Sequence, residues 1–172
     1  DELAKDWAKQ PIDVATLSQM APELPSPPVP DDGEPAADGF ERWKWTNTAA
    51  QKQPGFVSVV ITIPIGNINT WQFRELARIT RKYSGGYSRT DQNQNLVMRW
   101  VRPESLKMLH RELLAIGFGD AEANMLADVV ACPGADSCKL AITSSNQAGY
   151  SMREELIKFD YQDEEVLKVN VK

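Results

Sequence analysis

The only two cysteines of the chain, Cys132 and Cys138, are separated by five residues in one short segment. Between them, Pro133 and Gly134 predict a turn, because proline fixes φ and glycine permits backbone conformations that other residues avoid. Three chemistries suit such a pair: a disulfide, a metal or iron–sulfur site, and two unrelated thiols. Two converging thiolates would supply half of a closed zinc or iron–sulfur site, which takes four protein ligands. The sequence holds no second cysteine pair to complete it.

His110 is the only histidine and the other residue type that metal sites commonly use. It follows Leu109 in a segment with helical periodicity, and the sequence offers it no partner. We therefore expect His110 to lie on the surface and to take no part in a site.

Composition limits the classes of protein to which the chain can belong. Its 172 residues are enough for one core, and 42% hydrophobic with 25% charged residues is typical of a globular protein. No run of 18 apolar residues predicts a membrane span, and the N-terminus lacks the basic and apolar regions of a signal peptide. Two cysteines do not make a disulfide framework, so we expect a reducing cytoplasmic location.

The charge is distributed unevenly along the chain. Residues 1–40 hold nine acidic residues and two lysines, a net charge of −7, which leaves +2 of the total of −5 for residues 41–172. A charge of +2 is too weak to predict nucleic-acid binding, although it is compatible with a small anionic ligand.

The first segment, residues 1–39, is predicted to be a short helix followed by a linker. Leu3 and Trp7 could share one helical face, and Pro11 interrupts it. Seven of the eleven prolines lie in residues 1–40, which favours an extended spacer or surface strap.

The second segment, residues 40–118, has a strand–helix–strand–helix pattern. Aromatic residues from Phe40 to Trp45 are expected at the edge of a core. The pattern then predicts a strand buried on both faces at residues 56–65, a helix from Asn69 or Thr70 to Gly85, a strand at 96–101 and a helix from Pro103 to Gly117. The predicted apolar faces of the two helices are Phe73, Leu76, Ala77, Thr80 and Tyr83, and Leu106, Leu109, Leu113 and Ile116. This order indicates an α+β fold of ferredoxin-like character.

The third segment, residues 119–172, contains the cysteine pair. We expect a short helix at residues 121–126, a helix that starts within residues 139–145 and another helix at 152–159. Leu167, Val169 and Val171 alternate with polar residues, which predicts a half-buried strand at residues 166–171. Because that strand would run to the last residue, we interpret Lys172 as a cut end.

Four motifs together resemble the C-terminal half of the sirohaem-dependent nitrite/sulfite reductases. They are Gln51-Lys52-Gln53-Pro54-Gly55, Ile63-Pro64-Ile65-Gly66, Arg89-Thr90-Asp91-Gln92-Asn93-Gln94-Asn95-Leu96 and the C-x5-C pair of cysteines. One departure is that Asp91 stands where the family often has threonine, which puts contact of that position with sirohaem in doubt.

The resemblance implies cofactors, partners and roles for particular residues. It makes Cys132 and Cys138 two ligands of a [4Fe–4S] cluster coupled to sirohaem, with the second cysteine pair expected beyond Lys172. It makes Arg89, Gln94 and Asn95 candidates for sirohaem binding, and it assigns no catalytic residue to this chain. The implied reaction is six-electron reduction of nitrite to ammonia or of sulfite to sulfide, with ferredoxin or a similar donor, and with the N-terminal half of the same parent as a partner.

The same resemblance divides the chain into a helix with an acidic linker at 1–39, a ferredoxin-like half-domain at 40–118 and part of an α/β iron–sulfur/sirohaem-binding domain at 119–172. We expect the 172-residue chain alone to be inactive. Two alternatives stay open: a non-catalytic ferredoxin-like binding module that has lost the redox centre, and a two-cysteine redox switch. For Arg89, Gln94 and Asn95 a separate alternative to sirohaem binding is that they only satisfy backbone groups of their turn.

Overall fold

The computed structural model describes residues 28–158, 164–169 and 171 of the chain. The helices and strands, with η marking a 3-10 helix, are α3 (Phe40–Asn47), β1 (Thr48–Ala50), β2 (Val57–Ile61), η1 (Pro64–Gly66), α4 (Thr70–Ser84), β3 (Ser88–Thr90), β4 (Leu96–Val101), η2 (Pro103–Ser105), α5 (Leu106–Ala115), η3 (Gly134–Asp136), α6 (Ser145–Lys158) and α7 (Glu164–Leu167).

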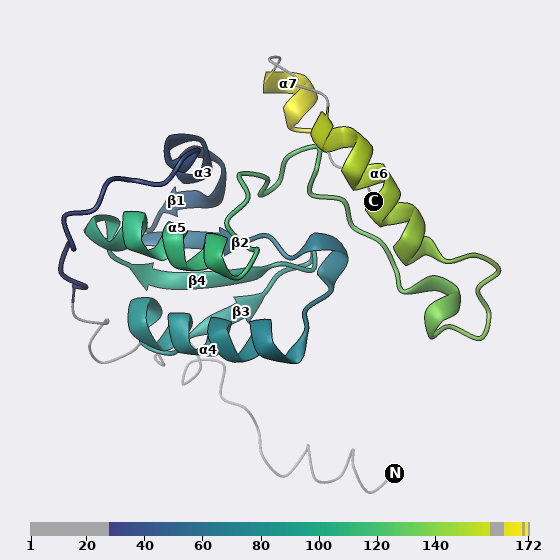
Figure 1. The fold of residues 1–172 in the computed structure, drawn as a ribbon, viewed down its shortest axis with the longest axis horizontal. Helices are drawn as coiled ribbons and strands as arrows, with labels where there is room; N and C mark the ends of the chain where they lie inside the picture. The colour runs from purple at the N-terminus through teal and green to yellow at the C-terminus, as the bar shows by residue number, and fades with distance from the viewer. Residues whose placement is uncertain (1–27, 159–163, 170, 172) are drawn as a thin grey trace, which may run out of the picture.

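The centre of the molecule is a four-stranded sheet with the strand order β1-β2-β4-β3, in which every neighbouring pair is antiparallel. Its register places Val60 opposite Val97, and Val97 opposite Arg89 on the far side. Helices α4 and α5 lie side by side and contact each other (Figure 1). The predicted α+β class is confirmed, and the short strands β1 and β3 add to the predicted pattern.

One hydrophobic core joins the sheet to these helices. In β2, Val59 and Ile61 are fully buried, whereas Ser58 and Val60 are half-buried. The prediction that this strand is buried on both faces is therefore wrong in this chain. The main core side chains are Phe40, Trp43, Val59, Ile61, Leu76, Ile79, Met98, Val101, Leu106, Leu109, Leu113 and Phe118.

Helix α4 begins and ends where its local sequence predicts. The Asn69 side chain accepts a hydrogen bond from the Gln72 N–H, and the Gln72 side-chain oxygen accepts one from the Asn69 N–H. Gly85 ends the helix in the left-handed conformation. The predicted apolar face needs one correction, because Phe73 is 59% exposed and Ile79 is buried instead. Helical spacing alone places both residues near the boundary of the face, and packing decided between them.

Helix α5 buries all four predicted apolar residues, and it also buries His110. The expectation of a surface histidine is wrong: His110 is 1% exposed and stacks on Trp43 with ring centroids 4.6 Å apart. Its Nε2 lies 3.0 Å from the carbonyl oxygen of Gly119. The residues of α3 that cover the histidine, Phe40 and Trp43, form the expected core edge, whereas Trp45 is half exposed.

The proline-rich segment runs over the surface as a strap from residue 28 onward. Val29 packs against the core, and Asp31 and Asp32 form ion pairs with Lys107 and Arg111 of α5. The predicted helix that contains Leu3 and Trp7 lies outside the described residues.

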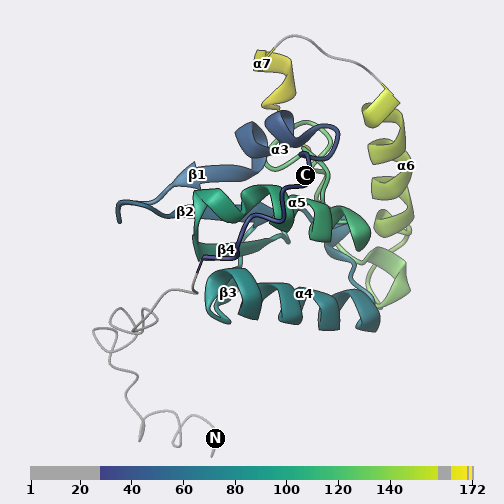
Figure 2. The same ribbon diagram turned by 60° about the vertical axis from the view of Figure 1, so that its left-hand side comes forward.

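Beyond α5, the structure differs from the expected third segment in three places. Residues 121–127 form turns rather than a helix, and α6 is one continuous helix where two were predicted. The expected strand at 166–171 is wrong, because residues 164–167 form α7 and no strand occurs in the described residues beyond β4. Figure 2 shows α6 standing beside the sheet unit, and α6 contacts η1 and η3. No helix among the described residues is long and apolar enough to cross a membrane.

Candidate cysteine-loop site

The cysteine loop, defined as residues 131–144, presents both thiols at the surface. Cys132 and Cys138 are exposed free cysteines. The loop is folded by its own backbone, since the Cys138 N–H donates to the Gly134 carbonyl at 2.9 Å and the Ala135 N–H donates to the Thr143 carbonyl at 2.9 Å. Two accessible thiols are therefore carried on a backbone with a defined shape.

Gly134 is the residue that allows the loop to fold against the start of α6. Its φ is +58°, and a Cβ there would lie 2.5 Å from the Ser145 nitrogen and 2.7 Å from the Thr143 oxygen. Any other residue would combine backbone strain with a collision against backbone atoms. The glycine predicted for a turn is thus required for close approach as well.

The environment of Cys132 favours its thiolate form. A hydrogen bond with the Ser145 side chain, followed by hydrogen bonding to the backbone at Gly134, lowers the pKa of Cys132. The thiolate is the form of cysteine that binds metals and reacts as a nucleophile. The start of α6 therefore contributes to the chemistry of the loop as well as to its shape.

The turn between β3 and β4, residues 91–95, lies against the segment that enters the cysteine loop. The Asp91 carboxylate accepts hydrogen bonds from the N–H groups of Asn93 and Asn95, at 2.8 and 2.9 Å. The Asp91 N–H donates to the Asn95 carbonyl at 3.0 Å. The aspartate that departs from the family pattern therefore serves its own turn, as aspartates commonly do.

The three candidate cofactor-binding residues have different surroundings. Arg89 is exposed on β3, and Gln94 is exposed with its side-chain N–H donating to the Ala131 carbonyl at 3.0 Å. Asn95 is 1% exposed, and its amide accepts from the Ile63 N–H at 2.9 Å and donates to the Asp128 carboxylate at 2.9 Å. The structure brings Gln94 and Asn95, but not Arg89, into contact with the segment before Cys132.

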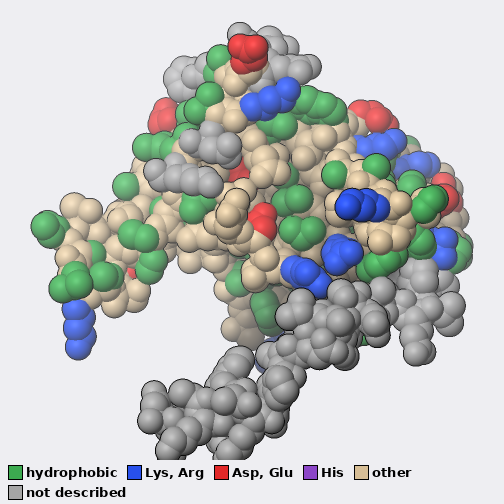
Figure 3. All heavy atoms as spheres, turned by 180° about the vertical axis from the view of Figure 1, so that it is seen from behind, with side chains coloured by type: hydrophobic (Ala, Val, Ile, Leu, Met, Phe, Trp, Pro, Cys, Tyr) green, Lys and Arg blue, Asp and Glu red, His purple; other side chains and the backbone are tan. Residues whose placement is uncertain are grey.

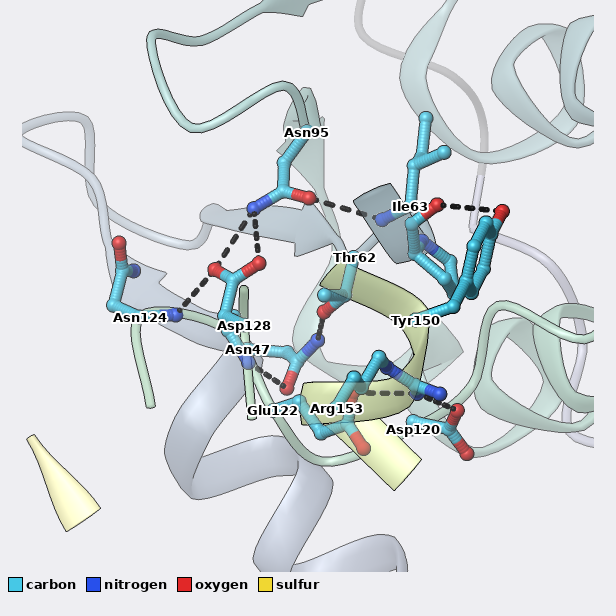
Figure 4. A network of polar contacts seen from close by, with 12 residues as sticks. Asn47, Thr62, Ile63, Asn95, Asp120, Glu122, Asn124, Asp128, Tyr150 and Arg153 are labelled. Atoms are coloured by element: carbon cyan, nitrogen blue, oxygen red, sulfur yellow. Dashed lines mark hydrogen bonds and ion pairs between the residues drawn. The ribbon is translucent and has the colours of Figure 1, made fainter. Parts of the chain in front are cut away.

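Asp128 is a buried carboxylate that the sequence analysis did not single out. It accepts hydrogen bonds from the Asn95 side chain and from the Asn124 N–H (Figure 4). Burial raises the pKa of Asp128, against the lowering effect of these hydrogen bonds. The only sequence signal was an acidic residue directly before the apolar Val129 and Val130.

The start of α6 is held from the other side. The Asn67 amide donates to the Asn146 side chain and to the Tyr150 hydroxyl, both at 3.1 Å. Arg153, further along α6, pairs with Glu122 at 2.7 Å and with Asp120 at 3.0 Å (Figure 4). A small open pocket of about 180 Å³ lies between these contacts and the turn; its lining residues are Ile65, Gly66, Asn67, Gln94, Ala131, Pro133 and Asn146.

The donor atoms present fit half of a thiolate metal site. Cys132 and Cys138 are both accessible, and the Cys132 thiolate is favoured. Across residues 28–158, 164–169 and 171, no group of three or more histidine, cysteine, aspartate or glutamate side chains could hold a metal ion. A closed site with four protein ligands would need two further ligands from elsewhere.

Part of the chain matches a known protein family. Residues 49–116 match the family of nitrite/sulfite reductase ferredoxin-like half domains. This range covers the sheet with α4 and α5 and ends before the cysteine loop.

Several curated relatives are ferredoxin–nitrite reductases. The Oryza sativa chloroplastic enzyme is 31% identical over 108 residues, 63% of this chain and 18% of the relative. The Synechococcus elongatus enzyme is 26% identical over 142 residues, which are 83% of this chain and 25% of the relative. The Spinacia oleracea chloroplastic enzyme is 28% identical over 118 residues, which are 68% of this chain and 20% of the relative. The chain thus spans a quarter or less of the length of these relatives.

Proposed function

We propose that the chain is a segment of a ferredoxin-dependent nitrite reductase and that Cys132 and Cys138 bind a [4Fe–4S] cluster coupled to sirohaem, because residues 49–116 match the family of nitrite/sulfite reductase ferredoxin-like half domains. The observation that carries this proposal is the position of the two accessible thiols, on a loop that the half domain itself holds through Gln94. When bound, the two cofactors would supply six electrons, one at a time, to the substrate.

The residues of this chain would bind and orient these cofactors. Cys132 and Cys138 would be thiolate ligands, and the Ser145 hydrogen bond supports the deprotonated state of Cys132. Arg89 and Gln94 are exposed and could reach a cofactor, Arg89 through a charge-assisted hydrogen bond to a carboxylate. Asn95 is enclosed, so we assign it an indirect role through Asp128. No catalytic residue is proposed within this chain.

Nitrite is the favoured substrate and ferredoxin the favoured donor, because the relatives named above are ferredoxin–nitrite reductases. Sulfite is the alternative substrate within the same family. Several of these relatives are chloroplastic proteins, so the cytoplasmic location expected from the sequence stays a prediction.

The remaining ligands and the substrate pocket would come from other parts of a longer parent, including its N-terminal half. Leu140 and Ile142, which follow Cys138 in the cysteine loop, are 92% and 97% exposed. Figure 3 shows hydrophobic side chains gathered on the part of the molecule that projects at the left of the view. Exposed apolar groups of this kind are typical of contact sites, and we expect the 172-residue chain alone to have no reductase activity.

The test uses the full parent protein that carries this segment. We expect the purified parent to contain iron, acid-labile sulfide and sirohaem, and to consume nitrite with reduced ferredoxin. Cys132→Ser and Cys138→Ser should each lose the iron and sulfide, whereas Ser137→Ala, an exposed change between the two cysteines, should retain them. The proposal fails if the parent lacks these cofactors or if the cysteine variants keep a full iron content.

A non-catalytic ferredoxin-like module is the second candidate function. The observation that favours it is that the match to the half-domain family, residues 49–116, ends before both cysteines. A parent without iron, sulfide and sirohaem would support this module, and a parent with all three would exclude it.

A further inference from the structure

We propose that the β3–β4 turn, residues 91–95, is the positioning element for Cys132, with Gln94 as its principal residue. The turn would fix the backbone of residues 128–131, which leads directly into that cysteine. This inference rests on the proposed function for its purpose, because a metal ligand must be held at a defined position and direction. The contacts on which it depends are independent of any metal.

Gln94 makes the contact closest to the cysteine. Its side-chain N–H donates to the carbonyl of Ala131, the residue before Cys132, at 3.0 Å. Gln94 has a backbone φ of +62°, which is uncommon for a residue other than glycine and indicates that its surroundings hold it in this conformation. A Cβ at Gly66 would lie 3.0 Å from the Gln94 Cβ and 3.1 Å from its Oε1, so the missing side chain leaves the space that Gln94 occupies.

The side chains of Asn93 and Asn95, on either side of Gln94, make further contacts with residues that precede Ala131. Asn95 donates to the buried Asp128 carboxylate at 2.9 Å, and Asn93 donates to the Asn124 side chain at 3.1 Å. Asn95 also accepts a hydrogen bond from the Ile63 N–H, so its amide joins the end of β2 to Asp128 (Figure 4). Three consecutive residues of one turn, 93–95, therefore hold three points of residues 124–131.

The conformation of the turn is determined by Asp91. Its carboxylate accepts hydrogen bonds from the Asn93 and Asn95 N–H groups, which stabilises the backbone that carries Gln94 and Asn95. The segment that they hold has no regular secondary structure from residue 128 to 133. The side-chain hydrogen bonds therefore add to two backbone hydrogen bonds of this segment, from the Asp128 N–H to the Met125 carbonyl and from the Val130 N–H to the Val171 carbonyl.

The experiment compares hydrogen exchange in the metal-free chain and in three variants. Gln94→Glu keeps the size of the side chain but removes the donor. Gln94→Asn keeps the donor and favours a positive φ, but it is one methylene too short. Gln92→Glu makes the same glutamine-to-glutamate change at an exposed position of the same turn, so it serves as the matched control. The reporters are the hydrogen-bonded amides of Val130, Ala135 and Cys138, with α4 and α5 as references.

We expect both Gln94 variants to raise the exchange rates of the reporter amides by about tenfold, which corresponds to the loss of one hydrogen bond. The exchange rates of α4 and α5 should not change, and Gln92→Glu should leave the reporter amides at their wild-type rates. The inference is overturned if neither Gln94 variant raises exchange, if only Gln94→Glu does, if Gln92→Glu has the same effect, or if α4 and α5 change equally.

A second readout tests the purpose of the contact. In the cluster-loaded parent, we expect Gln94→Glu and Gln94→Asn to shift the midpoint potential of the cluster, with Gln92→Glu at the wild-type value. An unchanged potential in both Gln94 variants would overturn a role in positioning the ligand. A parent that contains no cluster would overturn the proposed function instead, and the exchange measurement would still decide whether the turn holds the loop.

Discussion

At the scale of single residues, His110 shows how a polar side chain can belong to a core. Its ring packs against Trp43 and Phe40, with centroids 4.6 and 5.8 Å away, and Nε2 donates to the Gly119 carbonyl at 3.0 Å when the neutral ring carries its proton there. In the described part of the chain, Nδ1 has no hydrogen-bond partner. Burial lowers the pKa of His110, because the charged ring loses its hydration.

This environment predicts a pH dependence of stability. An unfolded histidine has a pKa of about 6.5 and the folded one a lower value, so the unfolded chain binds more protons as the pH falls below about 6.5. The stabilising contribution of neutral His110 is full above that pH and is lost as the pH falls through the folded pKa. We expect the free energy of unfolding, measured with urea, to fall by roughly 1 kcal/mol more between pH 7.5 and 5.5 than in His110→Gln.

The comparison with His110→Gln isolates the histidine. Burial raises the pKa of both Glu122 and Asp128, an effect that acts in the opposite direction and is the same in both proteins. Parallel pH profiles for wild type and variant would contradict the prediction.

At the scale of elements, the cysteine loop and the start of α6 fold as a unit because their backbones touch. Gly134 is buried at φ +58°, whereas Gly55 in the β1–β2 connection has φ +83° with nothing within 4 Å of an added Cβ. A comparison of alanine substitutions at the two glycines therefore separates the cost of a positive φ from the cost of a steric collision.

We expect Gly55→Ala to reduce the free energy of unfolding by about 1–2 kcal/mol, the cost of an unfavourable φ. Gly134→Ala should cost about 1–3 kcal/mol more, the cost of a collision in a packed site, or should open the loop locally. Urea unfolding measures the first effect, and tryptic cleavage after the exposed Lys139 measures the second. If Gly134→Ala equals Gly55→Ala in both measurements, the loop does not depend on this close approach.

At the scale of the whole molecule, α6 is joined to the sheet unit by a largely buried ion pair. Arg153 and Glu122 have side chains 14% and 12% exposed, with nitrogen and oxygen 2.7 Å apart. The pKa of Glu122 is nevertheless raised, because burial outweighs the attraction of Arg153. The pair therefore fixes how the pieces dock more than it adds stability.

Removing one partner of this pair should be costly. We expect Arg153→Met to reduce the free energy of unfolding by about 3 kcal/mol, because Glu122 would remain buried without a cation. The double variant Arg153→Met with Glu122→Met should recover part of that loss, since it leaves no buried charge unpaired; Asp120, the other partner of Arg153, is half exposed. Thermal and urea unfolding of the three proteins provide the measurement, and a double variant no better than the single one would contradict the explanation.

The sequence by itself determined the elements whose signals are local. The β-branched run of β2, the Asn69 cap of α4, the apolar stripe of α5 and the paired cysteines are each contained within a few residues, and helix or strand periodicity and capping act over that range. The family resemblance also needed only short local motifs, namely residues 51–55, 63–66 and 89–96 and the C-x5-C pair.

Tertiary structure decided what depends on residues distant in the sequence. His110 is buried because α3 and α5 pack together, and Asn95 is enclosed because residues 124–131 return to the β3–β4 turn. Alternation predicted a strand at residues 166–171, but residues 166 and 167 belong to α7 and the described residues 168, 169 and 171 form no strand, because a strand needs a neighbour that no local pattern can supply. The two cysteines could be read from the sequence, but the side chains that hold them could not, since those contacts span more than thirty residues.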